Sequence, residues 1–506
     1  MNRRELMAFL GGAMAAGAPR WLLAQAPAAR APAFDALAAR DPWLTGWKTF
    51  GRESIGPTAA TLEGRWPGSL AGTLFRNGPG WFDRAGVRYQ HWFDGDGLMQ
   101  AWRIGGGRVS HAARMVGTYK FQQEQRSGRF ELPAAGTLIE NPSPIRNNDD
   151  VNTANTAVMR IGKRTFALWE GGSAIEIDPD TLQTRGPVTW REDLVAAPFS
   201  AHPLPERDGS VWNFGSLAFF RGSGLCIWRI GADGKLADFQ VLDTPEPGYL
   251  HGFAMTERHL VFMLMPFHMD TVDGAFFQRM KFQPQKPCRV ALVPKDALGS
   301  PRWFECEFAM AYHFGDAFER GDEVVMRVIR HRDVEEARSP MAEAMRGQRR
   351  PQGNGGSARP GTDLASLHLD LKTGAARWET HGIEGVEFPI FDDRSEGPAL
   401  LFTACTVGHA DAPYFNGIAG LDVERGRTRQ WRYGARVLAE EHRFVPRPGS
   451  RRPGEGWLLG TVLDHERGRS GLALLDAERI DQGPVATAWV PYTTPLGFHG
   501  WFAPQS

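Results

Sequence analysis

Short runs in which apolar and polar residues alternate dominate this chain, whereas long amphipathic helical patterns are scarce. The runs at 174–178, 225–229 and 367–370 each lead into a turn built on Asp, Gly or Pro. Alternation with a period of two, interrupted by turn residues, is typical of antiparallel β-strands. Because the same unit of strand and turn recurs along the chain, the pattern predicts an all-β protein.

The spacing of these units favours a β-propeller. Loose self-similarity at about 60–70 residues, with four short strands per unit, is typical of propeller blades. Spacing alone leaves the number of blades open. In a propeller the innermost strands of successive blades line one axis, so residues that are far apart in sequence can meet there. We expect both ends of the chain to take part in closing the ring.

Two segments depart from the strand rhythm. Residues 334–360 combine a short helical piece with a Gly-rich stretch, which predicts a mobile insertion between blades. Residues 265–282 crowd Met and Phe side chains together. We interpret these side chains as part of the hydrophobic core. The alternative is an apolar tunnel entrance or a patch that contacts a membrane.

The N-terminus resembles an export signal. Arg3 and Arg4 precede an Ala- and Gly-rich run at 8–18, and 24–26 offer small residues for cleavage. The alternative is a disordered basic N-terminus that is never removed. A working signal predicts a periplasmic protein, and a non-functional one a cytoplasmic protein. We therefore divide the chain into a twin-arginine-type signal peptide, a flexible tether and one propeller domain, at residues 1–26, 27–40 and 41–506.

Composition narrows the range of partners. Lys plus Arg equals Asp plus Glu at 58 each, so the overall charge gives no reason to expect nucleic acid. Seventeen Trp and thirty-one Phe can supply both a core and an apolar binding site. The chain has no C-x-x-C motif, so its cysteines indicate neither a zinc site nor a disulfide pattern, and we expect small buried hydrophobes at Cys226, Cys288, Cys306 and Cys405.

Four histidines stand beside apolar or aromatic residues and close to Gly or Pro, which places them at strand ends and tight turns: His202, His251, His313 and His499. Any single one of them has the alternative of a packed ring with one satisfied nitrogen. Four neutral imidazoles that arrive from separate parts of a chain suit iron, zinc or copper. On an octahedral iron they would leave two positions open.

Six short motifs follow one another in a fixed order: Arg76-Asn77-Gly78-Pro79, His91-Trp92-Phe93-Asp94-Gly95-Asp96-Gly97, Ala201-His202-Pro203, Glu387-Phe388-Pro389, Phe444-Val445-Pro446-Arg447 and Gly497-Phe498-His499-Gly500. Through them the chain resembles the carotenoid cleavage oxygenase family, whose members split a carbon–carbon double bond with dioxygen. The resemblance covers nearly the whole mature chain. It implies a seven-bladed β-propeller with the metal on the central axis, and with loops and short helices forming a cap over one face.

The resemblance also assigns the site. It implies one Fe2+ per chain, bound by His202, His251, His313 and His499. It implies an outer shell of carboxylates that fix the imidazole rings, at Glu170, Glu387 and Glu441. Glu440 stands beside Glu441 and is the alternative under a one-residue shift. No side-chain nucleophile, acid or base and no organic cofactor is implied.

The expected function is that of a non-haem Fe(II) dioxygenase which cleaves a conjugated double bond of a carotenoid or apocarotenoid with O2, giving two carbonyl products. Its expected partners are a lipophilic alkene and O2, with peripheral membrane contact left open. One alternative is a stilbene dioxygenase, but acidic residues in 149–156 stand where we would look for the lysine that grips a phenol. Alternatives from other classes are a non-catalytic metal-binding propeller and a zinc hydrolase.

The remaining histidines are expected to be structural or solvated. His91 precedes a turn and is interpreted as part of it, and His111 lies in a strand-like segment, with substrate contact at the border of a tunnel as the alternative. Eight others stand mostly beside charged or turn residues and are expected to be solvated: His259, His268, His331, His368, His381, His409, His442 and His465.

Overall fold

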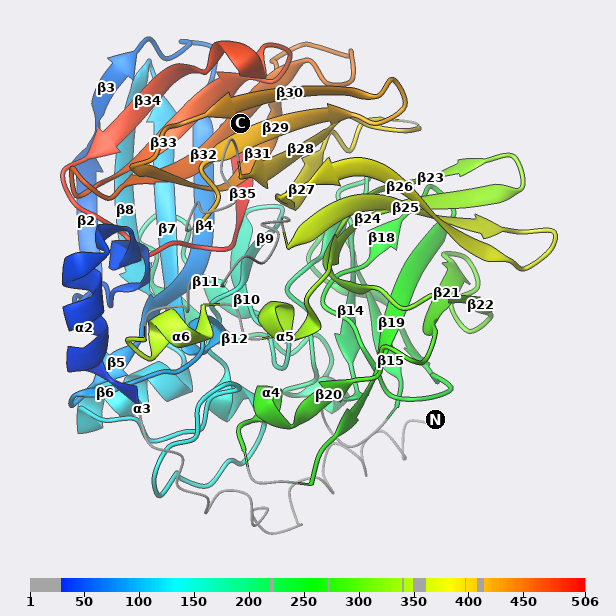
Figure 1. The fold of residues 1–506 in the computed structure, drawn as a ribbon, viewed down its shortest axis with the longest axis horizontal. Coiled ribbons are helices and arrows are strands. Elements are labelled where there is room, and N and C mark those ends of the chain that lie inside the picture. Colours follow the sequence, from blue (N-terminus) through cyan, green and yellow to red (C-terminus); the bar gives the residue numbers. More distant parts are fainter. Residues whose placement is uncertain are drawn as a thin grey trace, which may run out of the picture.

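The computed structural model describes residues 29–218, 223–271, 274–338, 341–348, 361–395, 397–406 and 414–505. The signal peptide expected at residues 1–26 lies outside these ranges, as does His409. Within the described part of the chain, seven antiparallel sheets of four to six strands surround a common centre (Figure 1). The prediction of a seven-bladed β-propeller is therefore confirmed.

The first blade contains both an early and the last strand of the chain. From the outside inward it is composed of β2 (Ser54–Ala59), β8 (Arg108–Met115), β7 (Asp96–Gly105), β4 (Gly72–Trp81) and β35 (His499–Pro504). From the inside outward the second is composed of β9 (Ala157–Ile161), β10 (Arg164–Leu168), β11 (Ile175–Ile177) and β12 (Thr184–Pro187). The third is composed of β13 (Leu204–Pro205), β14 (Val211–Ser216), β15 (Leu225–Ile230) and β16 (Leu236–Leu242).

The fourth blade is the widest, with β17 (Gly248–Tyr249), β18 (Ala254–Met255), β19 (His259–Met269), β20 (Met280–Phe282), β21 (Cys288–Pro294) and β22 (Arg302–Cys306). The fifth is composed of β23 (Met310–Arg320), β24 (Glu323–His331), β25 (Thr362–Asp370) and β26 (Ala376–Glu384). The sixth is composed of β27 (Val386–Phe391), β28 (Leu401–Cys405), β29 (Gly417–Asp422) and β30 (Arg427–Arg432). The seventh is composed of β31 (Val437–Pro446), β32 (Gly456–Asp464), β33 (Arg469–Asp476), β34 (Pro484–Val490) and β3 (Thr61–Gly64).

Both ends of the chain close the ring, as expected. On the inner side β35 pairs with β4, so that His499 lies opposite Asn77. On the outer side β3 pairs with β34, so that Thr61 lies opposite Trp489. The inner strands of neighbouring blades are also in contact with one another, and β35 contacts both β9 and β31. The last strand of the sequence is therefore held at the centre of the molecule.

Apolar side chains fill the space between neighbouring blades. Between the third and fourth blades, Trp212 and Phe214 on β14 pack with Phe262 and Leu264 on β19. These positions alternate along each strand with residues of the opposite face, which is why the sequence shows a period of two. Full burial of one such side chain contributes roughly 1.5–3 kcal/mol. The core therefore consists of layers between blades, and the axis is left for polar groups.

Three short helices lie on one side of the ring (Figure 1). Of these, α5 (Val334–Arg338) lies near the centre of the view, α2 (Ala31–Arg40) lies at the left edge beside the first blade, and α6 (Ala342–Met345) lies between them. Other elements outside the blades are β1 (Ala29–Arg30), β5 (Asp83–Arg84), β6 (Val87–Arg88), α3 (Tyr119–Ser127), α4 (Phe276–Arg279) and the 3-10 turns η2 (Pro42–Trp47), η3 (Trp92–Asp94), η4 (Asn148–Val151), η5 (Glu192–Leu194) and η7 (Ile480–Gln482).

Two predictions for the segments that contain α2, α5 and α6 are wrong. The flexible tether expected at 27–40 contains helix α2, in which Phe34 and Leu37 are buried. The insertion expected between blades at 334–360 lies within the fifth blade, between β24 and β25. Its expected helical piece is present as α5 and α6, and Met345 of α6 is fully buried in one apolar cluster with Phe34, whereas its Gly-rich stretch lies outside the described residues. The Ala- and Pro-rich sequence concealed this packing, because only Phe34, Leu37 and Ala38 of α2 enter that cluster.

Other expectations for apolar segments are confirmed. In the segment 265–282, Met265, Phe277 and Met280 are buried in one cluster with residues of β23 and β24, so the core interpretation is correct. The four cysteines, all within the described ranges, are buried free thiols. Among the described residues, no helix has both the length and the apolar composition that a transmembrane span requires.

Candidate metal centre

The four predicted histidines meet among the innermost strands of four blades. His202 lies two residues before β13, His251 lies between β17 and β18, His313 lies in β23, and His499 begins β35. Each can offer one ring nitrogen, and these four nitrogens lie within 4.8 Å of one another. Four blades therefore deliver one imidazole each to a single point, as the spacing of the strands predicted.

Irregular strand pairing directs the polar groups of three inner strands to this point. The β23–β24 register shifts between Ala311 and Phe314, where His313 lies. The β27–β28 register shifts just after Glu387, and the β31–β32 register shifts between Ala439 and His442, where Glu441 lies. A bulge bends a strand and redirects a side chain that regular pleating would point elsewhere. The centre is thus built at the points where the sheets depart from regular pairing.

Carboxylates hold three of the four imidazole rings. His313 Nδ1 donates to Glu387 Oε2 at 2.6 Å, and His499 Nδ1 donates to Glu441 Oε1 at 2.9 Å. His251 Nδ1 donates to Glu170 Oε1. Among the described residues, no carboxylate lies within hydrogen-bond distance of the His202 ring. The three glutamates named from the sequence therefore contact three different histidines of the cluster.

These contacts leave lone pairs that point at one another. With Nδ1–H donated to a carboxylate, the Nε2 of a neutral imidazole carries only a lone pair. His313 Nε2 and His499 Nε2 are in this state and lie 3.2 Å apart, and His202 Nε2 lies 2.7 Å from His251 Nε2. Since neither His313 nor His499 has an N–H left to donate, a cation between the rings would satisfy all four nitrogens. The donor set therefore fits a metal ion such as iron, zinc or copper.

Three of the four imidazoles, those of His202, His251 and His499, have a lowered pKa. Burial lowers the pKa of His202 and of His251 well below 6.5, and the neighbouring imidazoles lower it further. Burial also lowers the pKa of His499, although Glu441 opposes this change. Because a metal binds the neutral imidazole, these shifts keep the nitrogens available at neutral pH.

The contact with the His499 ring decides between Glu440 and Glu441, whereas Arg76 pairs with both. Its guanidinium donates to Glu440 Oε2 at 2.8 Å and to Glu441 Oε2 at 2.9 Å, and it is fully buried. Only Glu441 of the two acidic residues reaches the His499 ring, whereas Glu440 Oε1 accepts from the backbone N–H of Gly497 at 3.2 Å. Burial raises the pKa of Glu441, but His499, Arg443 and Arg76 outweigh it and lower the pKa to about 2. Sequence reasoning missed the role of Arg76, although it noted the motif that contains it.

Glu387 has a second histidine partner that the sequence did not reveal. His331 Nε2 lies 3.0 Å from Glu387 Oε1, so the expectation that His331 is solvated is wrong. The same expectation is wrong for His442 and His368, which are buried. His331 stands between Arg330 and Arg332, and that charged context concealed its inward position.

The two histidines expected to be structural are so placed. His91 Nδ1 accepts from the backbone N–H of Phe93 at 3.1 Å and caps the turn η3. His111 is fully buried with Tyr492 and Gln100 as hydrogen-bond partners. Neither histidine belongs to the cluster of four imidazoles.

Aromatic rings flank the imidazoles. The ring centroid of Tyr312 lies 5.1 Å from that of His251, and that of Phe388 lies 5.2 Å from His313 and 5.5 Å from His499. Phe388 has φ +55°, a left-handed conformation that is unfavourable for a bulky residue, above all before a proline. Such strain persists where surrounding structure enforces it. It places one aromatic face against two of the imidazoles, which reduces the access of water to them.

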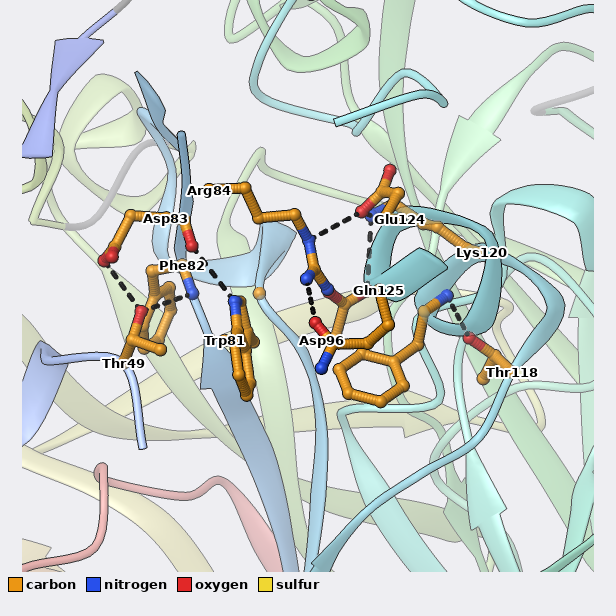
Figure 2. Close-up of polar contacts among 12 residues, drawn as sticks. Thr49, Trp81, Phe82, Asp83, Arg84, Asp96, Thr118, Lys120, Glu124 and Gln125 are labelled. Atoms are coloured by element: carbon orange, nitrogen blue, oxygen red, sulfur yellow. Dashed lines mark hydrogen bonds and ion pairs between the residues drawn. The ribbon is translucent and has the colours of Figure 1, made fainter. Parts of the chain in front are cut away.

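The motif at 91–97 has a structural role away from the cluster. Figure 2 shows Asp96 accepting from Arg84, at 3.1 Å, while Arg84 also contacts Glu124 of α3. Lys120 pairs with Asp96 at 3.2 Å and with Glu124 at 2.8 Å, and all four side chains are almost fully buried. Two cations thus neutralise two carboxylates and clamp α3 onto the first blade.

This clamp also bears on the phenol-gripping lysine expected of a stilbene enzyme. Lys120 contacts the hydroxyl of Tyr89, both side chains are fully buried, and the Lys120 charge is paired with Asp96 and Glu124. The acidic residues of 149–156 are engaged in local contacts: Asp149 accepts from Ser173 Oγ at 2.8 Å, and Asp150 pairs with Arg146 at 2.7 Å. Asp149 and Asp150 therefore stabilise the conformation of their own loops.

Comparison with known proteins agrees with this geometry. A family model described as retinal pigment epithelial membrane protein matches residues 49–504. The apocarotenoid-15,15'-oxygenase of Synechocystis is 27% identical, over 91% of this chain and 96% of that protein. The isoeugenol monooxygenase of Pseudomonas putida is 26% identical, over 91% of this chain and 97% of that protein. The crystal structure of a cobalt-substituted Synechocystis apocarotenoid oxygenase superimposes with a TM-score of 0.79 at 25% identity, covering 92% of this chain and 99% of that one.

Proposed function

The chain belongs to the family of the retinal pigment epithelial membrane protein, which is that of the carotenoid cleavage oxygenases, and on this premise we propose that it is a non-haem iron dioxygenase. It cleaves a conjugated carbon–carbon double bond of an apocarotenoid or carotenoid with O2, and it releases two carbonyl products. The observation that carries the proposal is the set of four imidazoles among the innermost strands, three of them fixed by buried or half-buried carboxylates.

His202, His251, His313 and His499 would hold the iron. When bound there, Fe2+ supplies the activation of O2, which the side chains of the protein cannot provide. Glu387 and Glu441 accept hydrogen bonds from the Nδ1–H groups of His313 and His499. These bonds orient each ring so that its Nε2 faces the metal position. Four neutral imidazoles would leave the charge of the ion to be balanced by the carboxylates behind them, Glu170, Glu387 and Glu441. Tyr312 and Phe388 limit water and offer aromatic faces to an apolar alkene.

A polyene is the first choice of substrate. The Synechocystis relative is named for an apocarotenoid, and its similarity extends over nearly the whole of both chains. The isoeugenol relative supports a second candidate, a phenolic alkene related to the stilbene alternative. Lys120 and Tyr89 are in contact, so a lysine–tyrosine pair of the type that grips a phenol is present, although the Lys120 charge is also paired with Asp96 and Glu124.

The test is product mass spectrometry after the ferrous protein has been incubated in air with carotenoids, apocarotenals, isoeugenol and hydroxystilbenes. Paired carbonyl fragments from a polyene are expected, and fragments from a phenolic alkene alone would favour the second candidate. His313→Ala serves as the matched control, because it removes one imidazole and leaves the other three in place. The absence of product from every compound, with iron bound, would overturn the proposed function.

We also propose that residues 1–26 direct export and are removed. Cleavage after residue 26 would leave β1 and α2 intact, so the mature chain would keep the helix that docks on α6. The N-terminal mass of protein recovered from the periplasm tests this proposal. An intact Met1 there would overturn removal, and retention in the cytoplasm would overturn export.

A further inference from the structure

We propose that His331 is a positioning residue of the metal centre, which holds Glu387 and through it orients His313. The inference depends on one part of the proposed function, the binding of a metal ion by the four imidazoles. The described residues place the chain His313–Glu387–His331 in one line of hydrogen bonds, with 2.6 Å at the first contact and 3.0 Å at the second.

Glu387 is satisfied only when His331 is present. Its Oε2 accepts from His313 Nδ1 and from the backbone N–H of Phe388, so this carboxylate oxygen already has its donors on the side of the four imidazoles. Its Oε1 accepts from His331 Nε2. The Glu387 side chain is only 7% exposed, so water cannot readily replace that donor. A buried carboxylate oxygen without a donor is unfavourable, and the group would rotate to find one.

Comparison of the three carboxylates shows why this partner matters at Glu387. Glu441 is held on its far side by the buried guanidinium of Arg76 and by the backbone N–H of Gly500. Glu170 is 19% exposed, so water can reach it. Among the described residues no arginine pairs with Glu387, whose side chain is only 7% exposed, and His331 takes the place that Arg76 takes at Glu441.

The surroundings of His331 hold its ring in place. It is the last residue of β24, and its backbone pairs with Met310 of β23 and Thr362 of β25. Its ring packs edge to face on Tyr312, with centroids 5.3 Å apart, and Tyr312 in turn packs against His251. The Tyr312 hydroxyl donates to the backbone carbonyl of Ala337 in α5 at 2.8 Å, which fixes the tyrosine. His331 is therefore a rigid donor.

The experiment measures Co2+ binding to the full-length protein freed of metal, by titration and by the visible absorption of the bound ion. Removing an outer-shell partner of a ligand typically weakens metal binding about 10- to 100-fold. His331 is one contact further out, so we expect His331→Leu to weaken Co2+ binding about 3- to 10-fold and to shift the absorption bands. His331→Gln keeps an N–H donor and is expected to stay within about twofold of the unsubstituted protein.

The matched control is His368→Leu, which removes a buried histidine that pairs with Glu379 in the outer part of the same blade. It should leave the Co2+ affinity and spectrum unchanged. Should His331→Leu fail to fold, as judged by circular dichroism, His331→Phe carries the same test.

Co2+ affinity within twofold of the unsubstituted protein and an unchanged spectrum for His331→Leu would overturn the inference, as would equal losses in the His331 and His368 variants. Equal Co2+ binding by the unsubstituted protein and by His313→Ala would overturn the metal centre itself, and the inference with it. Normal Co2+ behaviour in all controls without turnover of any alkene would refute the proposed function and leave the role of His331 standing.

Discussion

Replacing Arg76 with methionine removes the charge that two buried carboxylates share, while most of the side-chain volume remains. The Arg76 guanidinium lies 2.8 Å from Glu440 and 2.9 Å from Glu441, and the three side chains are 0%, 5% and 2% exposed. Removing one partner of a buried ion pair typically costs about 3–5 kcal/mol, because the other charge stays buried without compensation. Whole domains have unfolding free energies of only about 5–15 kcal/mol. We therefore expect Arg76→Met to lower the unfolding free energy by about 3–5 kcal/mol.

The Arg76 side chain lies close against the backbone of β35, because a Cβ at Gly500 would lie 2.7 Å from Arg76 Cδ. Arg76→Lys keeps the charge but cannot contact both carboxylates with a planar fork, so we expect an intermediate loss. Glu440→Gln in the Arg76→Met background removes one of the two uncompensated charges and should recover part of the loss.

The assay is urea unfolding of the metal-free proteins at pH 7, followed by tryptophan fluorescence. Arg185→Met is the matched control, since Arg185 pairs with Asp178 at an exposed position and exposed pairs contribute little. A loss below about 1 kcal/mol for Arg76→Met, or no recovery with Glu440→Gln, would refute the view that Arg76 compensates both carboxylates.

Three further predictions follow from particular side chains. His313→Ala should abolish metal binding and leave the propeller folded; normal metal content by elemental analysis would contradict the ligand assignment. The pKa of Glu441 is lowered from 4.5 to about 2 in the folded protein. Ionised Glu441 therefore contributes about 3 kcal/mol to the unfolding free energy above about pH 4.5, and this contribution is lost as the pH falls toward 2. Unfolding free energies of the unsubstituted and Glu441→Gln proteins should therefore converge over that range, and a constant difference would count against the assignment. Phe34→Ala removes a buried ring from α2 and should lower the unfolding free energy by about 3–5 kcal/mol. Residues 27–40 should then become accessible to limited proteolysis. Unchanged protease resistance would show that the docking of α2 does not depend on Phe34.

Local patterns in the sequence were enough for the propeller class and for the four candidate histidines, whereas the resemblance to a known family supplied the number of blades and the three glutamates. The alternation of apolar and polar residues reports directly which face of a strand is buried, so it predicted the blades. His313 and His499 stood out because a polar ring within an apolar and aromatic stretch must be buried and needs partners. Glu387, which the resemblance supplied, fits the same reasoning.

The remaining features depended on contacts between residues that are distant in sequence. Arg76 and Glu441 are 365 positions apart, and only closure of the ring by β35 brings them together. His331 lies in a charged stretch that reads as solvated, and it points to the axis because β24 ends beside β27. The register shifts beside His313, Glu387 and Glu441 leave no local signature, because a bulge is a property of two paired strands. The sequence by itself determined which residues could form the centre, and the tertiary structure decided which partners hold them, since those partners are selected by the pairing and packing of the blades.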